Sequence, residues 1–474
     1  MVYKKVNLIV IFLAISSNLL FGQSNSMLFL MDNVPSTRNV NVAAYDDSVK
    51  FNFSLPLLSS IQASANSDFL YSNIIKKRPL DGSKFLDVNS FLASLDEENN
   101  INLEAKFNIL RFGFKVKESY VSFSVDEKIN FDVGIKKELF QFLLNGNKDL
   151  SNNQSIGGIM PSIAHTREIS LGYVRKFKIK DNYLNVGIKP KYYFGLADLN
   201  LNNELNYSNE NDFSKIGVNV SGDGTFSGPI DITSDNGKLD FNNIESNFEI
   251  SDYIANTSNS GLGFDFGFNY TMDIGEKDDE NKNGEALKKQ KLKIDFSLVD
   301  IGKINWETNT KKLNYQLAYQ FDGFDITNSL DSESDNYVSF GDLISDKIDS
   351  IETDNILNVQ ENQSYSTSFK PKFYLNTSFI FSEKFSAGLL FNSLNSGLFD
   401  DVNISVHSSL RLRDIVHLSA SYSKIGNMGL GLSLKGGPFQ IYVLTDNLLG
   451  TTKLASNPYE INDININFGI NFVF

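Results

Sequence analysis

The closing segment of the chain, residues 464–474, alternates between two kinds of side chain. One set of alternate positions holds Ile464, Ile466, Phe468, Ile470, Phe472 and Phe474, and the other holds Asn465, Asn467, Gly469, Asn471 and Val473. Because successive residues of a β-strand point to opposite faces, this predicts a strand with one apolar and one amide-rich face. In a soluble sandwich the apolar face would be core, whereas in a membrane barrel it would meet lipid. Alternation alone leaves both folds open.

Similar alternation recurs along the chain, in runs that are longer than most soluble strands. Most runs span about 9–13 residues, the length that a tilted strand needs to cross a bilayer, whereas soluble strands usually have about five or six. The runs include segments 184–196, 262–270, 369–381, 402–407 and 428–435. Strand length therefore favours a membrane barrel over a soluble, secreted all-β protein, which is the alternative.

The connections between the runs are of two kinds, as in barrels that have short turns at one end and long loops at the other. Short turns are expected at 126–128, 180–182, 382–384, 413–414 and 436–437, and long polar loops near 200–259, 274–289 and 325–364. Short amphipathic helices are expected near 85–95, 139–143 and 343–351, in the loops or the lumen. We therefore predict an all-β fold, a single transmembrane antiparallel β-barrel. Its expected number of strands is about 14 (12–16), an even number, as is normal for such barrels.

The N-terminus has the pattern of a secretory signal peptide. Lys4 and Lys5 precede an apolar run over residues 6–15, and the small residue Gly22 stands at the end of the segment. The run is shorter than the ~20 residues of a spanning helix, so we predict cleavage after Gly22. Residues 1–22 would then be the signal peptide and residues 23–474 the barrel domain, in contact with outer-membrane lipid. Phe468, Ile470, Phe472 and Phe474 would form the signal that the barrel-insertion machinery reads.

Composition excludes several classes of function. The formal net charge of −14 leaves no excess of Lys and Arg to neutralise phosphates, so nucleic-acid binding is not expected. The absence of cysteine excludes disulfides and thiolate metal sites. Neither a G-x-S-x-G elbow, an H-E-x-x-H pair nor a phosphate loop occurs, so we do not expect an enzyme.

Polar residues at alternate positions of the runs are candidates for a lumen lining. They are Lys189, Lys191, Asp265, Lys293, Asp295, Lys370, Lys372, His407, Arg411, Arg413 and His417. Their mixed charges are compatible with salt-bridged filling or with a weakly selective pore, and the sequence leaves both open. The histidines have no nearby carboxylate at ligand spacing, so a polar lining is favoured over a metal site.

One loop partly matches a calcium-binding pattern. Asp279, Asn281 and Asn283 stand at alternate positions before Gly284, and Glu285 could supply its backbone carbonyl. Gln290 stands where the bidentate glutamate of such loops is found, so the expected affinity is weak and a solvated acidic loop is the alternative. Counting strands back from the C-terminus places this loop at the long-loop end, outside the cell.

Several segments together resemble a family of Bacteroidota outer-membrane barrels that carries only a domain-of-unknown-function label. The segments are "LPLLSSI" (55–61), "LRFGFKVKESYVSFSVDEK" (110–128), "KELFQFLLNGN" (137–147), "SLVDIGKINWETNT" (297–310), "GLLFNS" (388–393) and "GPFQIYVLTDNLLG" (437–450). The resemblance covers nearly the whole mature chain, apart from an insertion near 274–289, and is specific for membership because its motifs are structural. The architecture also distantly resembles that of hydrophobic-compound transporters and of barrels of the type IX secretion system. A shared architecture does not by itself imply a shared function.

Two functions follow from these observations. The first is a passive or gated route across the outer membrane for a small solute, with hydrophobic compounds included. The second is a non-conducting adaptor barrel that serves a surface-protein secretion or assembly machine. The state of the lumen separates them, because an open channel favours transport and a filled lumen favours the adaptor.

Overall fold

The computed structural model describes most of the barrel and part of its loops. The described residues are 25–69, 75–77, 84–146, 151, 154–208, 216–228, 233–235, 238–240, 253, 255–274, 290–321, 356–393, 402–413, 415–423, 427–456 and 463–474. The expected signal peptide, the helix near 343–351 and the calcium-type loop lie outside these residues.

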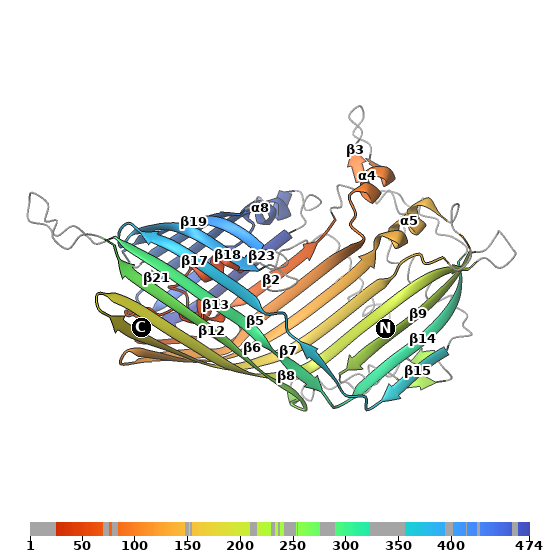
Figure 1. Ribbon diagram of the computed structural model, residues 1–474, viewed down its shortest axis with the longest axis horizontal. Coiled ribbons are helices and arrows are strands. Elements are labelled where there is room, and N and C mark those ends of the chain that lie inside the picture. Colours follow the sequence, from red (N-terminus) through yellow and green to blue (C-terminus); the bar gives the residue numbers. More distant parts are fainter. Residues whose placement is uncertain are drawn as a thin grey trace, which may run out of the picture.

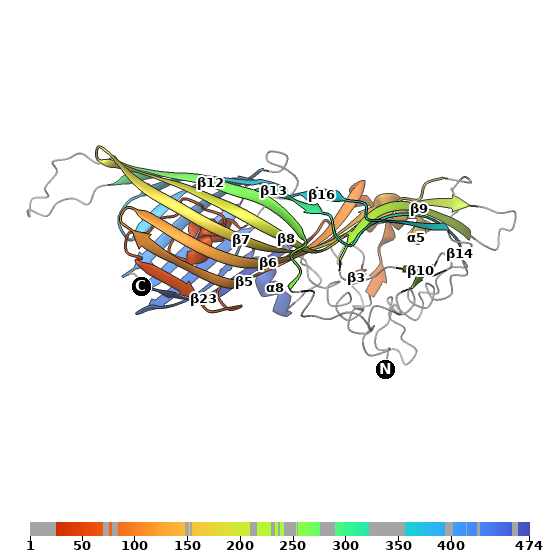
Figure 2. The same ribbon diagram turned by 90° about the horizontal axis from the view of Figure 1, so that it is seen from below.

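The strands form a closed antiparallel barrel of 14 strands, which confirms the predicted fold (Figures 1 and 2). The first wall strand is interrupted, and its two parts both pair with the last strand, which closes the ring. In order around the wall the strands are β1 (Phe51–Ser54) with β2 (Ile61–Ser67), β5 (Glu98–Val116), β6 (Ser119–Lys136), β7 (Ile159–Ile179), β8 (Asn182–Ser208), β12 (Asn259–Asp273), β13 (Lys291–Trp306), β17 (Lys372–Ile380), β18 (Phe385–Ser393), β19 (Val402–Leu412), β20 (Val416–Ser423), β21 (Met428–Gly436), β22 (Phe439–Thr445) and β23 (Asp463–Val473).

The two faces of the wall differ as the alternation requires. In β23 the residues of the amide-rich face are buried, while those of the apolar face are partly exposed from Ile466 to Phe472, and Phe474 is exposed. Large apolar side chains are exposed on the outside of many other strands, among them Leu171, Leu262, Val406 and Tyr422. An outer surface of this kind would be unfavourable in water and is suited to lipid.

A break in the first wall strand separates β1 from β2 at residues 55–60. Pro56 cannot donate a ladder hydrogen bond, and Leu57 has a left-handed backbone, with φ of 63°. The wall stays closed because Leu57 N–H donates to Asn108 O at 2.9 Å and Ile470 N–H donates to Leu58 O at 2.8 Å. The "LPLL" part of the motif is therefore a turn within the wall.

On one side the wall continues far beyond the barrel (Figure 1). The final part of β8 pairs with β9 (Ile216–Ser227), which pairs with β14 (Thr310–Phe321), and β14 pairs with β15 (Ile356–Glu361). Segment 200–259, expected to be a polar loop, therefore contains strand. The turn expected at 126–128 was also wrong, because β6 runs through it.

Short elements cover the long-loop end of the barrel. Helix α4 (Val88–Ala93) and helix α5 (Lys137–Asn145) match two of the expected helices and pack together through Phe91 and Phe140, whose rings are 5.3 Å apart. Helix α8 (Leu448–Ser456) precedes β23, and strand β16 (Tyr365–Ser368) pairs with the end of β13. Two small hairpins are formed by β3 (Ile75–Lys77) with β4 (Lys84–Leu86) and by β10 (Thr233–Asp235) with β11 (Lys238–Asp240). Within the described residues, no helix is long and apolar enough to span a membrane.

The strand directions correct the expected position of the calcium-type loop. Thr271 of β12 pairs with Tyr183 of β8, close to the short turn between β7 and β8. Asp273 at the end of β12 pairs with Lys291 at the start of β13, so the loop between them leaves the wall at the short-turn end. Strand counting back from the C-terminus had placed it at the opposite end because it counted residues 312–322 as a wall strand, whereas β13 pairs directly with β17 in the wall.

Candidate functional site

The lumen is occupied by residues 25–49, which we call the plug (Figure 2). The plug contains helix α2 (Ser26–Leu30) and the 3-10 helix η1 (Pro35–Asn39), and it joins β1 at the short-turn end. The sequence analysis did not identify it. Its one signal is an apolar run, "MLFLM" at 27–31, which follows the expected cleavage point and lacks the strand alternation.

The first half of the plug packs against the wall through apolar side chains. Met27, Leu28 and Phe29 are almost fully buried, in a cluster that includes Tyr374 and Leu444 of the wall. The ring of Phe29 stacks on that of Tyr374, with centroids 5.0 Å apart and an interplanar angle of 11°. Burying each such side chain contributes about 1.5–3 kcal/mol, so this contact stabilises the docked plug.

Glycines on the inner face of the wall make room for the plug. A Cβ atom at Gly187 would lie 2.5 Å from the backbone oxygen of Val42. A Cβ atom at Gly429 would lie 2.8 Å from Met27, and one at Gly431 would lie 3.1 Å from the sulfur of Met31. The wall is therefore shaped to hold this segment closely.

Polar contacts fix the start of the plug near the long-loop end. The Ser26 hydroxyl donates to Asn392 Oδ1 at 3.1 Å, and Met27 N–H donates to the half-buried Asp446 carboxylate at 2.7 Å. Burial raises the pKa of Asp446, and the neighbouring Asp463 raises it further, although the bond from Met27 opposes this. Further along, the hydroxyls of Ser36 and Tyr442 are 2.8 Å apart.

At the short-turn end the plug forms the floor of an open cavity of about 750 Å³. Asp32 faces this cavity, where it pairs with Arg411 and, at 3.6 Å, with Lys293. Burial alone would raise the pKa of Asp32, but the charges of Arg411 and Lys293 outweigh it and hold the pKa below its ordinary value. Asn33 Oδ1 lies 2.6 Å from His417 Nδ1, so plug and wall are joined by polar contacts at this end too.

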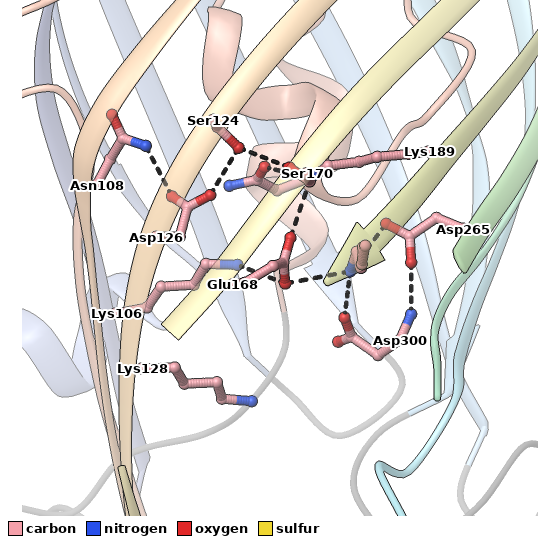
Figure 3. Close-up of polar contacts among 12 residues, drawn as sticks. Lys106, Asn108, Ser124, Asp126, Lys128, Glu168, Ser170, Lys189, Asp265 and Asp300 are labelled. Carbon is pink, nitrogen blue, oxygen red and sulfur yellow. Dashed lines mark hydrogen bonds and ion pairs between the residues drawn. The ribbon is translucent and has the colours of Figure 1, made fainter. Parts of the chain in front are cut away.

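On the other side of the plug, a group of buried charges fills the lumen (Figure 3). Lys191 is at its centre, with Nζ 2.7 Å from Asp300, 2.9 Å from Asp265 and 3.3 Å from Glu168. We call this group the lumen charge cluster and define it as Glu104, Lys106, Arg111, Asp126, Lys128, Glu168, Lys189, Lys191, Asp265, Asp300 and Lys372.

A β-bulge in β13 places Asp300 in this cluster. Asp300 has a left-handed backbone, with φ of 62°, where the register between β12 and β13 shifts. Its N–H donates to Asp265 Oδ1 at 2.8 Å. A non-glycine residue in this conformation costs about 1 kcal/mol or more, which the pairing with Lys191 offsets.

Seven of the cluster residues were not among those expected to line the lumen: Glu104, Lys106, Arg111, Asp126, Lys128, Glu168 and Asp300. Asp126 and Lys128 were assigned to a turn, yet Asp126 pairs with Arg111 at 3.2 Å and Lys128 with Glu104 at 3.0 Å. The available signal was alternation, since Ser124, Asp126 and Lys128 share one face of β6. Asp300 could not be found from the sequence, because its side chain faces the lumen only through the bulge.

The remaining expected lumen residues lie in different surroundings. Asp295 is buried 3.1 Å from Lys293, and His407 is buried with Nε2 2.8 Å from Asn376 Oδ1. Lys370 and Arg413 are exposed and lie outside the strands, which does not fit a lumen wall position. No group of three or more metal-ligating side chains occurs among the described residues, which exclude Asp279, Asn281, Asn283 and Glu285.

Comparisons with known proteins place this geometry in context. The sequence model of one family, described as a family of unknown function (DUF5723), matches residues 44–446. No curated protein sequence matches the chain. The toluene transporter TodX of Pseudomonas putida is similar over 96% of this chain and 95% of its own, at 7% identity and a TM-score of 0.39. The FrpB iron transporter of Neisseria meningitidis matches over 90% and 82%, at 6% identity and a TM-score of 0.21. Structural similarities at such low identity and TM-score say nothing about which solute, if any, this barrel would carry.

Proposed function

The chain belongs to the family of unknown function DUF5723, and for this member we propose a gated route for a small solute across the outer membrane. The plug is the gate. The apolar outer face of the barrel supports a location in lipid, and the family match covers most of the wall. The proposal includes no catalytic step.

The observation that carries the proposal is how the lumen is closed. With cleavage after Gly22, as the sequence predicts, the plug would be tethered to the wall at one end only, by the chain between Tyr45 and β1. Its contacts with the wall are non-covalent, and about 750 Å³ of open cavity lies beside it at the short-turn end. A segment held in this way can leave the lumen without unfolding any strand. If wall side chains alone filled the lumen, it could open only by distorting the wall.

Displacing the plug would expose an apolar surface within the lumen. Four wall residues that now pack against the plug would then face the solute: Tyr374, Leu390, Tyr442 and Leu444. This favours solutes with an apolar part, which include the hydrophobic compounds considered from the sequence. Partners beyond lipid and the insertion machinery are not required.

A reversible cross-link between plug and wall tests the gate. The side-chain oxygens of Ser26 and Asn392 are 3.1 Å apart, and the chain has no native cysteine, so a Ser26→Cys/Asn392→Cys variant would contain a single pair of thiols. The variant would be tested in its oxidised and in its reduced form. The measurements are planar-bilayer conductance and the uptake of small apolar and polar solutes into vesicles. We expect flux only after reduction, and constant flux in a variant that lacks residues 25–44.

The adaptor function gives a different result in the same experiment. A barrel that conducts nothing would show no flux in the oxidised, reduced or deleted forms, although circular dichroism still shows a folded barrel. The filled lumen is compatible with that alternative. Absence of flux after deletion of the plug would therefore reject the proposed route.

A further inference from the structure

The outer face of β7 carries a charged residue within an apolar surface near the short-turn end. Leu171, Tyr173, Phe177 and Ile179 are 37–52% exposed on this face, and Arg175, between Tyr173 and Phe177, is exposed as well. Because this surface is suited to lipid, a charge at this position is unfavourable unless it reaches an anionic partner.

The neighbouring strands supply no such partner for Arg175. Ser119 of β6 and Val186 of β8 lie directly opposite Arg175. The outer-face positions next to them hold apolar residues, which are Val121, Phe123, Leu184 and Ile188. The guanidinium carbon lies 5.5 Å from the ring centroid of Phe177, and the side chain interacts with the hydroxyl of Tyr173. Within the described residues Arg175 therefore has aromatic neighbours and no ion pair.

The position of Arg175 along the wall corresponds to the boundary between hydrocarbon and headgroups. It is four residues from the end of β7, which is about 10 Å along the barrel axis at about 3.3 Å per residue and a tilt near 40°. Arginine can lay its aliphatic stem on an apolar surface and extend its charge towards water. Exposed aromatic side chains are typical of this boundary, and this end of the barrel has several, among them Phe51, Phe114, Phe177, Phe385 and Phe439.

Two short turns add positive charge next to Arg175. The turn between β5 and β6 lies beside β7, because Lys176 N–H donates to Glu118 O at 2.8 Å. Asp47, which follows the plug helices, pairs with Lys115 at 3.0 Å and with Lys176. We call this group the rim patch and define it as Lys115, Lys117, Arg175, Lys176, Lys178 and Lys180 with Asp47, Glu118 and Asp181.

The rim patch has an excess of positive charge. It contains six basic and three acidic side chains, in a chain whose net charge is −14. Residues 274–290, which leave the wall at the same end, include five acidic and four basic residues and so do not cancel the excess. Lys117 and Lys180, in the two turns, are exposed, and within the part of the chain that the structure describes neither forms an ion pair. Their charges are therefore accessible to a ligand outside the protein.

We propose that the rim patch binds the phosphodiester headgroup of an anionic phospholipid, with Arg175 and Lys117 nearest to the lipid. The occupant is a lipid because Arg175 lies on the apolar outer face, where a soluble anion would have to leave water. A zwitterionic lipid would bring its own cation and leave the excess charge of the patch uncompensated. The site does not depend on whether the barrel conducts, because it is formed by the outside of the wall.

Lipid selectivity of the whole barrel in vesicles tests the site. Spin-labelled phosphatidylglycerol and phosphatidylcholine would be compared by electron spin resonance, in which lipid bound to the protein is motionally restricted. We expect the wild type to prefer phosphatidylglycerol about 2- to 5-fold, the factor that a basic residue near an anionic surface supplies at low salt. The preference should fall to about one in Arg175→Gln/Lys117→Gln. It should persist in Lys312→Gln/Lys370→Gln, a matched control that removes two exposed lysines away from the short-turn end.

The wild-type measurement decides the matter even if the Arg175→Gln/Lys117→Gln variant does not insert. Equal association of the two lipids with the wild type would overturn the proposal. A preference that persists in the inserted Arg175→Gln/Lys117→Gln variant would overturn the assigned residues. Inorganic phosphate is the competing occupant: if it abolishes the preference while chloride at equal ionic strength does not, the patch is a site for free phosphate and the lipid proposal is wrong.

Discussion

Adding a single methyl group to the wall should release the plug. A Cβ atom at Gly187 would lie 2.5 Å from the oxygen of Val42 and 2.9 Å from the Cα of Ala43, so it meets backbone that cannot rotate away. The plug must therefore move by about 1 Å, and overpacking of this kind typically costs about 1–3 kcal/mol. Since ~1.4 kcal/mol is tenfold in an equilibrium, Gly187→Ala should raise the undocked population about 5- to 150-fold.

The undocked population can be measured with a buried thiol. Ser36 is fully buried in the docked plug, so Ser36→Cys would react with a polar maleimide only when the plug is out. Because the chain has no native cysteine, this thiol is the only reactive one. The labelling rate in Gly187→Ala should exceed that in the Ser36→Cys background by the factor above.

Gly436→Ala is the matched control, because nothing lies within 4 Å of a Cβ atom at Gly436. Its labelling rate should equal that of the Ser36→Cys background. If Gly187→Ala labels no faster than Gly436→Ala, while both barrels give the same circular dichroism, then the plug is not packed on the wall as described.

Three further predictions concern charge, lipid and calcium. Asp32→Asn should lower the thermal midpoint only slightly, because its ion pairs are partly exposed and such pairs contribute about 0.2–1 kcal/mol. The pKa of Asp32 is below the ordinary value of 3.8. The difference in thermal midpoint between wild type and Asp32→Asn should therefore be constant from about pH 7 to 5 and disappear as the pH falls below 3.8. We expect less barrel in the membrane fraction after Ile470→Asp, because a charge on the lipid face costs about 2–4 kcal/mol, and also after replacement of Phe474 by Ser. The control Ile470→Leu should insert normally. Equal amounts of Ile470→Asp and Ile470→Leu in the membrane would contradict the assigned outer face. Calcium titrated into the refolded barrel should bind weakly, and an Asp279→Ala/Asn281→Ala variant should lose that heat, whereas identical calorimetric traces would leave only a solvated loop.

Period-two alternation was sufficient to predict the barrel and its strand number. The closing strand was legible because lipid and lumen select different side chains at every second position, as Ile470 and Asn471 illustrate. The same rule failed at Asp126, Glu127 and Lys128, where three charged residues in a row look like a turn. In the structure Asp126 and Lys128 belong to the lumen charge cluster, while Glu127 pairs with Arg167 and, at 3.1 Å, with His165.

The plug was not predictable because its structure depends on the finished wall. Residues 27–31 carry no strand period, and a helix of five residues has too few internal hydrogen bonds to be stable alone. Its conformation is set by Gly187, Gly429 and other wall residues that are distant in sequence. For the same reason the charge on Lys191 could be assigned to the lumen, but its partners Glu168 and Asp300 could not.

The unequal height of the wall controls the direction of approach to the lumen. Strand β8 has 27 residues and β22 has 7, so at about 3.3 Å per residue and a tilt near 40° the two flanks differ by about 50 Å in height. The tall flank acts as a screen, and a wide molecule such as an antibody would meet it before it could reach the lumen from that side. If the barrel conducts solutes as proposed, small molecules would approach from the low side of the wall, which is formed by the strands from β18 to β22.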